Sequence, residues 1–225
     1  MARLISISRH RIATDGKGVT TLVAFHGCPL DCRYCLNPQC KKDADRFRDY
    51  TPTQLLEEVQ KDDLYFKATG GGVTFGGGEP LLYPDFILEF RSLCPSEWKI
   101  NIESSLAVPT KNVEQIASLA DCMIIDVKDL NDDIYCRYTG CDNALLINNL
   151  QWIAGAGLQD RCLVRLPLIK GYNTKSNVSR SRIKLAAMGF THFDEFKYII
   201  KDDATPDADS ITAPIVLPGI PAPVL

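Results

Sequence analysis

The chain has 225 residues, of which 45% are hydrophobic and 24% charged, and its formal net charge is −3. This length allows one well-filled core and is short for two full enzyme domains. Charges of both signs are interspersed, without the basic patch that favours nucleic acid or an anionic membrane surface. No run approaches the roughly 20 apolar residues of a membrane helix. We therefore predict a soluble protein that binds neither nucleic acid nor membrane.

The cysteine content bears on the cellular compartment. There are nine cysteines, an odd number, and most of them are scattered without the regular spacing of a disulfide framework, which is typical of a reduced intracellular protein. Residues 1–12 alternate apolar and polar side chains and lack the continuous apolar core of a signal peptide. These features predict a cytoplasmic location, and we expect a monomer.

Strands and helices alternate along the chain. Residues 3–9 alternate with period two, as in an edge strand or a hairpin arm. Strand–helix alternation at the spacing that follows is the pattern of parallel βαβ units with right-handed crossovers. The patterns predict strands at 19–25, 73–75, 99–103, 123–127, 162–166 and 196–200, and helices at 51–66, 83–93, 113–120, 143–156 and 175–188.

The number of parallel strands defines the predicted architecture. About six are expected, against eight in a complete β/α barrel of ~250 residues. The fold class is therefore α/β, a partial barrel of six strand–helix units that is open on one side and admits a macromolecular substrate. We predict one such domain over residues 1–203. Residues 204–225 contain five prolines, which forbid a regular helix, and we expect this Pro-rich C-terminal extension to pack on the barrel.

Three cysteines directly after the predicted strand 19–25 form a CxxxCxxC motif: Cys28, Cys32 and Cys35. Thiolate sulfur is soft and selects zinc, copper(I) or iron–sulfur clusters. A closed zinc site needs a fourth ligand, and the local candidates are Cys40 and His26. A [4Fe–4S] cluster held by three cysteines instead leaves one iron to which a small molecule can bind.

Further candidate residues follow the other predicted strands. In parallel β/α folds, function collects at the carboxyl ends of the strands. Glycines at such an end let a ligand approach the backbone closely, and a charged residue within an apolar strand needs a partner. The groups in question are Gly76–Pro80 after the second parallel strand, Glu103 and Ser104 after the third, Asp126 and Lys128 at the fourth, and Arg165 on the fifth.

Together these motifs resemble the radical S-adenosylmethionine (SAM) enzymes, in which an aromatic residue such as Tyr34 usually precedes the last cysteine. The match extends to Asp15–Gly18, to 32–37 and to 68–80, which look like the corresponding segments of the pyruvate formate-lyase activating enzymes and their relatives. Those proteins generate the backbone radical of a glycyl radical enzyme. The similarity runs from about residue 14 to residue 200.

The resemblance implies a [4Fe–4S] cluster and SAM as cofactors. It assigns the metal to Cys28, Cys32 and Cys35, and a contact with the glycyl peptide to Asp15. Glu103 and Asp126 correspond to positions that hold a monovalent cation in some relatives. The residues that it assigns to SAM are Tyr34, Gly77, Gly78, Glu79, Glu103, Ser104, Asp126, Lys128 and Arg165.

The implied reaction is reductive cleavage of SAM to methionine and a 5′-deoxyadenosyl radical, which takes hydrogen from a glycine of a partner glycyl radical enzyme. A flavodoxin or ferredoxin is the expected electron donor, and the cluster implies anaerobic conditions. Residues 41–75 contain no cysteine, so we expect no inserted domain with further clusters.

The sequence departs from its relatives at three places. Leu36 stands where many relatives have a histidine, Glu103 replaces the more familiar aspartate, and residues 198–202 lack a histidine near the end of the sixth strand. Two alternatives therefore stay open. One is a radical SAM enzyme that acts on another peptide or small molecule, and the other is a zinc or electron-transfer module without catalysis.

Overall fold

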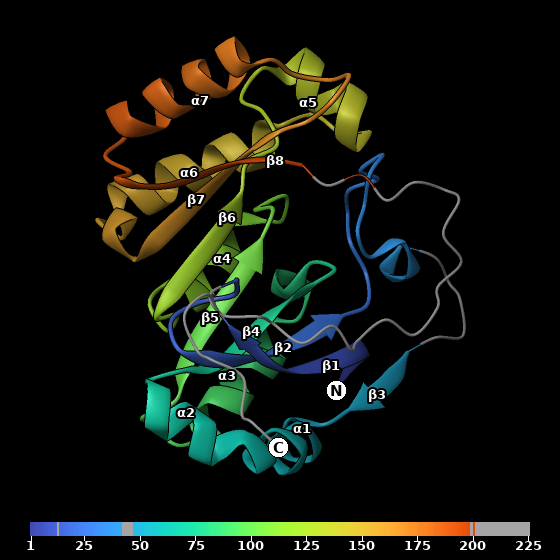
Figure 1. Ribbon diagram of the computed structural model, residues 1–225, viewed down its shortest axis with the longest axis vertical. Coiled ribbons are helices and arrows are strands. Elements are labelled where there is room, and N and C mark those ends of the chain that lie inside the picture. The colour runs from blue at the N-terminus through green and yellow to red at the C-terminus, as the bar shows by residue number, and fades with distance from the viewer. Residues whose placement is uncertain (13, 42–46, 199, 201–225) are drawn as a thin grey trace, which may run out of the picture.

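The computed structural model describes residues 1–12, 14–41, 47–198 and 200. Its centre is one eight-stranded sheet of order β3-β1-β2-β4-β5-β6-β7-β8 (Figure 1). The first two strands in this order pair antiparallel with their neighbours, and the next six run parallel. The strands are β1 (Ala2–Ile12), β2 (Val19–Phe25), β3 (Arg48–Tyr50), β4 (Gly72–Gly77), β5 (Lys99–Ser104), β6 (Cys122–Asp126), β7 (Cys162–Leu168) and β8 (His192–Lys197).

The parallel part of the sheet has the six strands that the sequence predicted. Within the described ranges β8 pairs only with β7, so the sheet does not close on itself. The prediction of an α/β partial barrel that is open on one side is therefore confirmed. As predicted for residues 3–9, β1 is a hairpin arm, because it pairs antiparallel with β2.

Helices connect the parallel strands and pack on one another in the order α1, α3, α4 and α6. Figure 1 shows the blue segment after β2 on the side of the sheet away from α6 and α7. The helices are α1 (Pro52–Val59), α2 (Asp63–Thr69), α3 (Pro84–Leu93), α4 (Thr110–Ala117), α5 (Asp132–Thr139), α6 (Ala144–Gly155) and α7 (Lys175–Ala187).

The core lies between the sheet and these helices. Phe75 on β4 contacts Phe25 on β2 and Phe90 on α3 edge to face, with ring centroids 5.7 and 5.3 Å apart, and all three are fully buried. Such pairs add to the roughly 25 cal/mol per Å² that apolar burial contributes. The rigid core holds the carboxyl ends of β2, β4 and β5 next to one another.

Three of the predicted elements need correction, and the helix expected at 113–120 spans Thr110–Ala117. The helix expected at 51–66 is broken at Gln60–Asp62 by a 3₁₀ turn, where the buried carboxylate of Asp62 accepts hydrogen bonds from Arg9 and from the hydroxyl of Thr21, both at 2.7 Å. The last strand begins at His192, four residues earlier than predicted, because pairing with β7 starts at Leu163. Helix α5 and strand β3 were not predicted.

The C-terminal extension over residues 204–225 lies outside the described residues, so its packing stays a prediction, as does the single domain over residues 1–203. Among the helices of the described ranges, none combines the length and the apolar character that crossing a membrane requires.

Candidate active site

A cavity of about 130 Å³ lies at the carboxyl ends of β2, β4, β5 and β6. It brings together most of the site residues that the sequence predicted, from four separate stretches of the chain. This volume is below the ~300–1,000 Å³ of typical small-molecule sites. The lining residues are Cys28, Leu30, Cys32, Cys35, Leu36, Asn37, Gly77, Gly78, Glu103, Ser104, Ser105, Asp126, Lys128 and Tyr198.

The cysteine loop is held from two directions. On one side, the short 3₁₀ helix Pro38–Cys40 returns the chain to its start, where the N–H of Gly27 donates to the carbonyl of Cys40 at 2.9 Å. On the other, the N–H groups of Asp31 and Arg33 donate to carbonyls in the last turn of α5, at 2.7 and 3.1 Å. Those carbonyls have no partner within their own helix, so α5 ends on the loop that carries the three thiols.

The three thiols differ in their electrostatic environment. Burial raises the pKa of Cys28 to about 12, with a further contribution from the charge of Glu79, and burial also raises the pKa of Cys32. An interaction with the thiol of Cys40 lowers the pKa of Cys35 to about 6. Metal binding to this loop must therefore release protons, because the ligand is the thiolate.

The donor set fits a cluster. Three thiols on one loop face one cavity, and soft sulfur is the ligand that iron–sulfur clusters take. Cys40 is buried behind them and does not line the cavity. In the part of the chain that the structure describes, no group of three or more His, Cys, Asp or Glu could hold a single metal ion. In a cluster held by three cysteines, by contrast, each thiolate binds a different iron, and the fourth iron has no protein ligand.

Gly77 and Gly78 form the wall next to the cysteine loop, and the close approach of the chain requires glycine at both positions. Gly77 has φ +85°, and a Cβ there would lie 2.6 Å from the Cβ of Ala24. A Cβ on Gly78 would lie 2.2 Å from the carbonyl oxygen of Gly27. The N–H groups of Gly78 and Glu79 donate to carbonyls of Phe25 and Gly27, at 3.0 and 2.8 Å, so this strand end is joined to the start of the loop.

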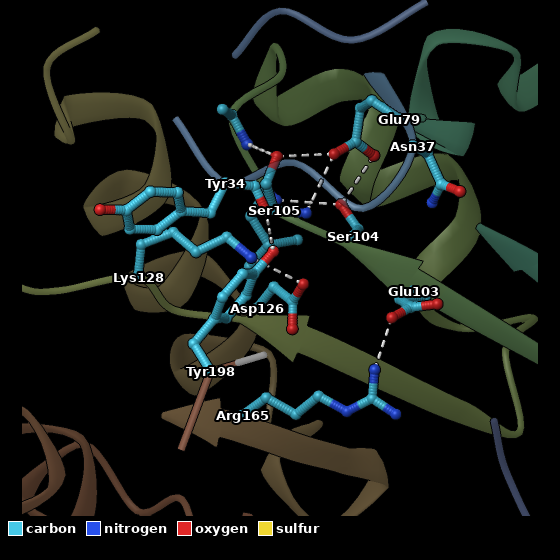
Figure 2. Close-up of polar contacts among 12 residues, drawn as sticks. Tyr34, Asn37, Glu79, Glu103, Ser104, Ser105, Asp126, Lys128, Arg165 and Tyr198 are labelled. Carbon is cyan, nitrogen blue, oxygen red and sulfur yellow. Dashed lines mark hydrogen bonds and ion pairs between the residues drawn. The ribbon is translucent and has the colours of Figure 1, made fainter. Parts of the chain in front are cut away.

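The opposite wall carries two ion pairs (Figure 2). Lys128 Nζ lies 2.9 Å from Asp126 Oδ2, and Arg165 Nη1 lies 2.5 Å from Glu103 Oε1. Burial, and next the charge of Asp126, raise the pKa of Glu103 to about 7 although Arg165 opposes the shift. Burial disfavours the charge of Lys128, but Asp126 outweighs this and raises the pKa of the ammonium. Arg165 does not line the cavity, and its side chain is linked to the cavity by the ion pair with Glu103.

Asp15 is placed inside the barrel and away from the cavity lining. The residue is 3% exposed, and its carboxylate is paired with Arg11. Its carbonyl accepts hydrogen bonds from Thr74 and, at 3.2 Å, from Asn101. The loop is thereby fixed against β4 and β5, and a contact of Asp15 with a peptide stays a prediction.

Tyr198 is a lining residue that sequence reasoning missed, although it belongs to the stretch 198–202 in which the resemblance led us to look for a histidine. Its hydroxyl donates to the carbonyl of Tyr34 at 2.9 Å, and its ring centroid lies 5.9 Å from Lys128 Nζ (Figure 2). The side chain of Tyr34 packs against Tyr138 and Tyr172, with centroids 6.2 and 5.7 Å apart, and does not line the cavity. The end of β8 therefore contacts the cysteine loop across the open side of the barrel.

Comparisons with known proteins agree with this arrangement. A family model described as the radical SAM superfamily matches residues 22–177. The chain is similar to a pyruvate formate-lyase-activating enzyme of Clostridium pasteurianum, with 36% identity over 140 residues that cover 62% of this chain and 58% of that protein. It is also similar to a (2S)-3-sulfopropanediol dehydratase activating enzyme of Klebsiella oxytoca, with 33% identity over 162 residues that cover 70% of this chain and 49% of that protein.

Among solved structures, SuiB of Streptococcus suis matches with a TM-score of 0.61 and 14% sequence identity, over 80% of this chain and 40% of that one. At this identity the likeness concerns the fold alone. The chain spans about half the length of the two curated relatives.

Proposed function

Because the chain belongs to the radical SAM superfamily, we propose that it is the activating enzyme of a glycyl radical enzyme. In this proposal Cys28, Cys32 and Cys35 hold a [4Fe–4S] cluster and the cavity beside them binds SAM. When bound, the cluster supplies one electron to the sulfonium of SAM, which gives methionine and a 5′-deoxyadenosyl radical. The hydrogen atom removed would be that of a glycine Cα of the partner, and the coproduct would be 5′-deoxyadenosine.

One observation carries the proposal: the cavity that the three cysteines line also contains two glycines, two carboxylates and an ammonium group. The amino-acid end of SAM is a zwitterion. Its carboxylate requires a cation, which Lys128 offers, and its ammonium requires oxygen acceptors, which the backbone of Gly77 and Gly78 offers.

The other residues at the cavity are proposed to bind a cation and to hold the cysteine loop in place. Ser104 lines the cavity from the end of β5, and Tyr198 holds the cysteine loop against the barrel through the carbonyl of Tyr34. Glu103 and Asp126 are the proposed oxygen ligands of a monovalent cation beside the SAM carboxylate. Such a cation is hard and prefers oxygen donors. Arg165 and Lys128 now occupy those two carboxylates, so the cation requires these side chains to turn away.

The names of the two relatives support the partner class, since both are activating enzymes of other enzymes. The open side of the barrel supports a macromolecular substrate, because a glycine within a folded partner must reach the cavity. A flavodoxin or ferredoxin as electron donor, a monomer and a cytoplasmic location complete the proposal.

The test is anaerobic reconstitution followed by electron paramagnetic resonance. The reconstituted protein should carry about four irons per chain and convert SAM to 5′-deoxyadenosine under a strong reductant. With the right glycyl radical enzyme it should then produce the doublet of a glycine-centred radical, and a variant partner with alanine at that glycine is the control. A colourless protein that binds zinc and leaves SAM intact would refute the proposal.

A further inference from the structure

The hydroxyl of Tyr135 is a buried hydrogen-bond donor without a partner. The side chain comes from the middle of α5 and is 1% exposed. Among the described residues, none forms a hydrogen bond with its hydroxyl oxygen. A buried polar group in this condition costs free energy, and nearly all such groups in folded proteins have a partner. The hydroxyl therefore indicates a bound group that completes it.

Helix α5 places Tyr135 next to the cysteine loop. Figure 1 shows the helix beside the blue segment after β2, and N–H groups of that loop donate to carbonyls in the last turn of the helix. The first turn is held as well, because Asn131 Oδ1 accepts from the N–H of Ile134 at 3.1 Å. Tyr135 belongs to the buried core against which Cys28 and Cys32 pack. The position of its ring is thus fixed from both ends of the helix.

The electrostatic surroundings of the hydroxyl include a proposed cluster ligand. Burial raises the pKa of Tyr135, and the next contribution in the same direction is the charge of a Cys32 thiolate, while Lys128 opposes the shift. Cys32 lines the cavity. Because its pKa is raised, the hydroxyl keeps its proton at neutral pH and can act only through that proton or its lone pairs.

The two other groups that influence Tyr135 are Cys141 and Glu79, and both have partners of their own. The thiol of Cys141 donates to a carbonyl of the cysteine loop at 3.5 Å. The carboxylate oxygens of Glu79 accept from groups of Ser104, Ser105 and Leu81. The sulfur atoms held by the cysteine loop are therefore the best acceptors for the hydroxyl.

We propose that the Tyr135 hydroxyl donates a hydrogen bond to a sulfur atom of the cluster, either the Cys32 thiolate or a bridging sulfide, and thereby raises the reduction potential of the cluster. The presence of a cluster there rests on the proposed function. Hydrogen bonds to the sulfur atoms are among the means by which a protein sets such a potential. The reduced cluster carries one more negative charge, so the donor stabilises it more than the oxidised cluster.

The test is Tyr135→Phe, which keeps the ring and removes only the hydroxyl. Tyr172→Phe is the matched control, because Tyr172 packs against Tyr34 in the cysteine loop but is only half-buried. Both reconstituted variants are titrated against potential without SAM, and the reduced cluster is followed by electron paramagnetic resonance. At a fixed potential the ratio of reduced to oxidised cluster should fall about tenfold in Tyr135→Phe, which is about 59 mV for one electron. The control should stay within about twofold of the wild type, and an unchanged ratio in Tyr135→Phe overturns the proposal.

Thermal unfolding of the protein without cluster gives the second readout. In that form the hydroxyl is a buried group without a partner, so its removal should leave the unfolding midpoint unchanged or raise it. A midpoint that falls by several degrees in Tyr135→Phe would show that the protein itself provides the partner, and would refute the inference. A residue with a merely structural role would change this midpoint and leave the potential as it is.

Should Tyr135→Phe fail to take up the cluster, 3-fluorotyrosine inserted at position 135 replaces it. Fluorine makes the hydroxyl a stronger donor, so the ratio of reduced to oxidised cluster should rise, and no rise refutes the proposal. None of these readouts requires turnover. A protein that meets these expectations and forms no 5′-deoxyadenosine from SAM would refute the proposed function and leave the role of Tyr135 standing. Cleavage of SAM together with an unchanged potential in Tyr135→Phe would do the reverse.

Discussion

The pH dependence of stability offers a test of the charge balance inside the barrel, with Glu103→Gln as the perturbation. The pKa of Glu103 is raised from 4.5 to about 7, by burial first and by the charge of Asp126 second. Between these two pH values the folded protein keeps a proton that the unfolded chain has lost. The protonated carboxyl therefore stabilises the fold below pH 4.5, and this contribution is lost as the pH rises to about 7.

The magnitude follows from the same interval. A pKa difference of one unit corresponds to about 1.4 kcal/mol, so the rise of the Glu103 pKa from 4.5 to about 7 corresponds to about 3 kcal/mol of stability. We reduce this figure to ~2 kcal/mol because 23% of the Glu103 side chain is exposed to solvent, which screens the effect. For a chain of this length 1 kcal/mol moves the unfolding midpoint by roughly 2–4 °C. Relative to Glu103→Gln, the wild-type midpoint should thus fall by about 4–8 °C between pH 4.5 and pH 7.5.

Differential scanning calorimetry of both proteins without cluster, in the same buffers, measures this difference. Comparison at each pH cancels the titration of all other groups that the substitution leaves unchanged. Glu114→Gln, at an exposed position, should run parallel to the wild type. A constant difference between wild type and Glu103→Gln across the whole range would show that Glu103 titrates at its ordinary value, and our account of the ion-paired interior would be wrong.

Three further experiments test the site. Cys32→Ala should abolish the iron content and SAM cleavage together, whereas Cys40→Ala should keep about four irons per chain. Iron analysis of both variants measures this difference. Loss of the cluster in Cys40→Ala would show that Cys40 is a ligand. Gly77→Ala should lower the unfolding midpoint far more than Gly70→Ala, since both have positive φ but only the first meets neighbouring backbone within 3 Å. Lys128→Met leaves the partly buried Asp126 unpaired, which should cost about 2 kcal/mol in urea unfolding, and an unchanged free energy of unfolding would contradict this.

The parts of the fold that the sequence predicted are those that depend on local pattern. The apolar runs of the six parallel strands and the periodic helices between them are readable because each segment carries its own periodicity. The break at Gln60–Asp62, within the helix predicted at 51–66, could not be predicted from the local sequence. It depends on contacts of Asp62 with Arg9 and Thr21, which lie 53 and 41 residues away in the chain.

The same distinction applies to the site. The residue types in Cys28–Cys35 and Gly76–Glu79 pointed to the strand ends that form the cavity, since parallel strands bring their carboxyl ends to one edge. The direction of each side chain was not predictable. Nothing in the local sequence indicates that Glu79 turns away from the cavity toward Ser105, or that α5 ends on the cysteine loop. Both depend on residues brought together only by the fold.

The pairing inside the barrel has a consequence for how a zwitterion can bind. Carboxylates and cations are already matched there: Glu103 with Arg165, Asp126 with Lys128, and Asp15 with Arg11. In the proposed binding mode the ligand carboxylate takes Lys128, which would leave Asp126 as an unpaired buried charge, the expensive case, unless the proposed monovalent cation replaces Lys128 there. The pair between Asp126 and Lys128 lines the cavity with both members. A wall that carries both charge signs therefore suits a carboxylate and a cation that bind together, because each then finds a protein partner of opposite charge.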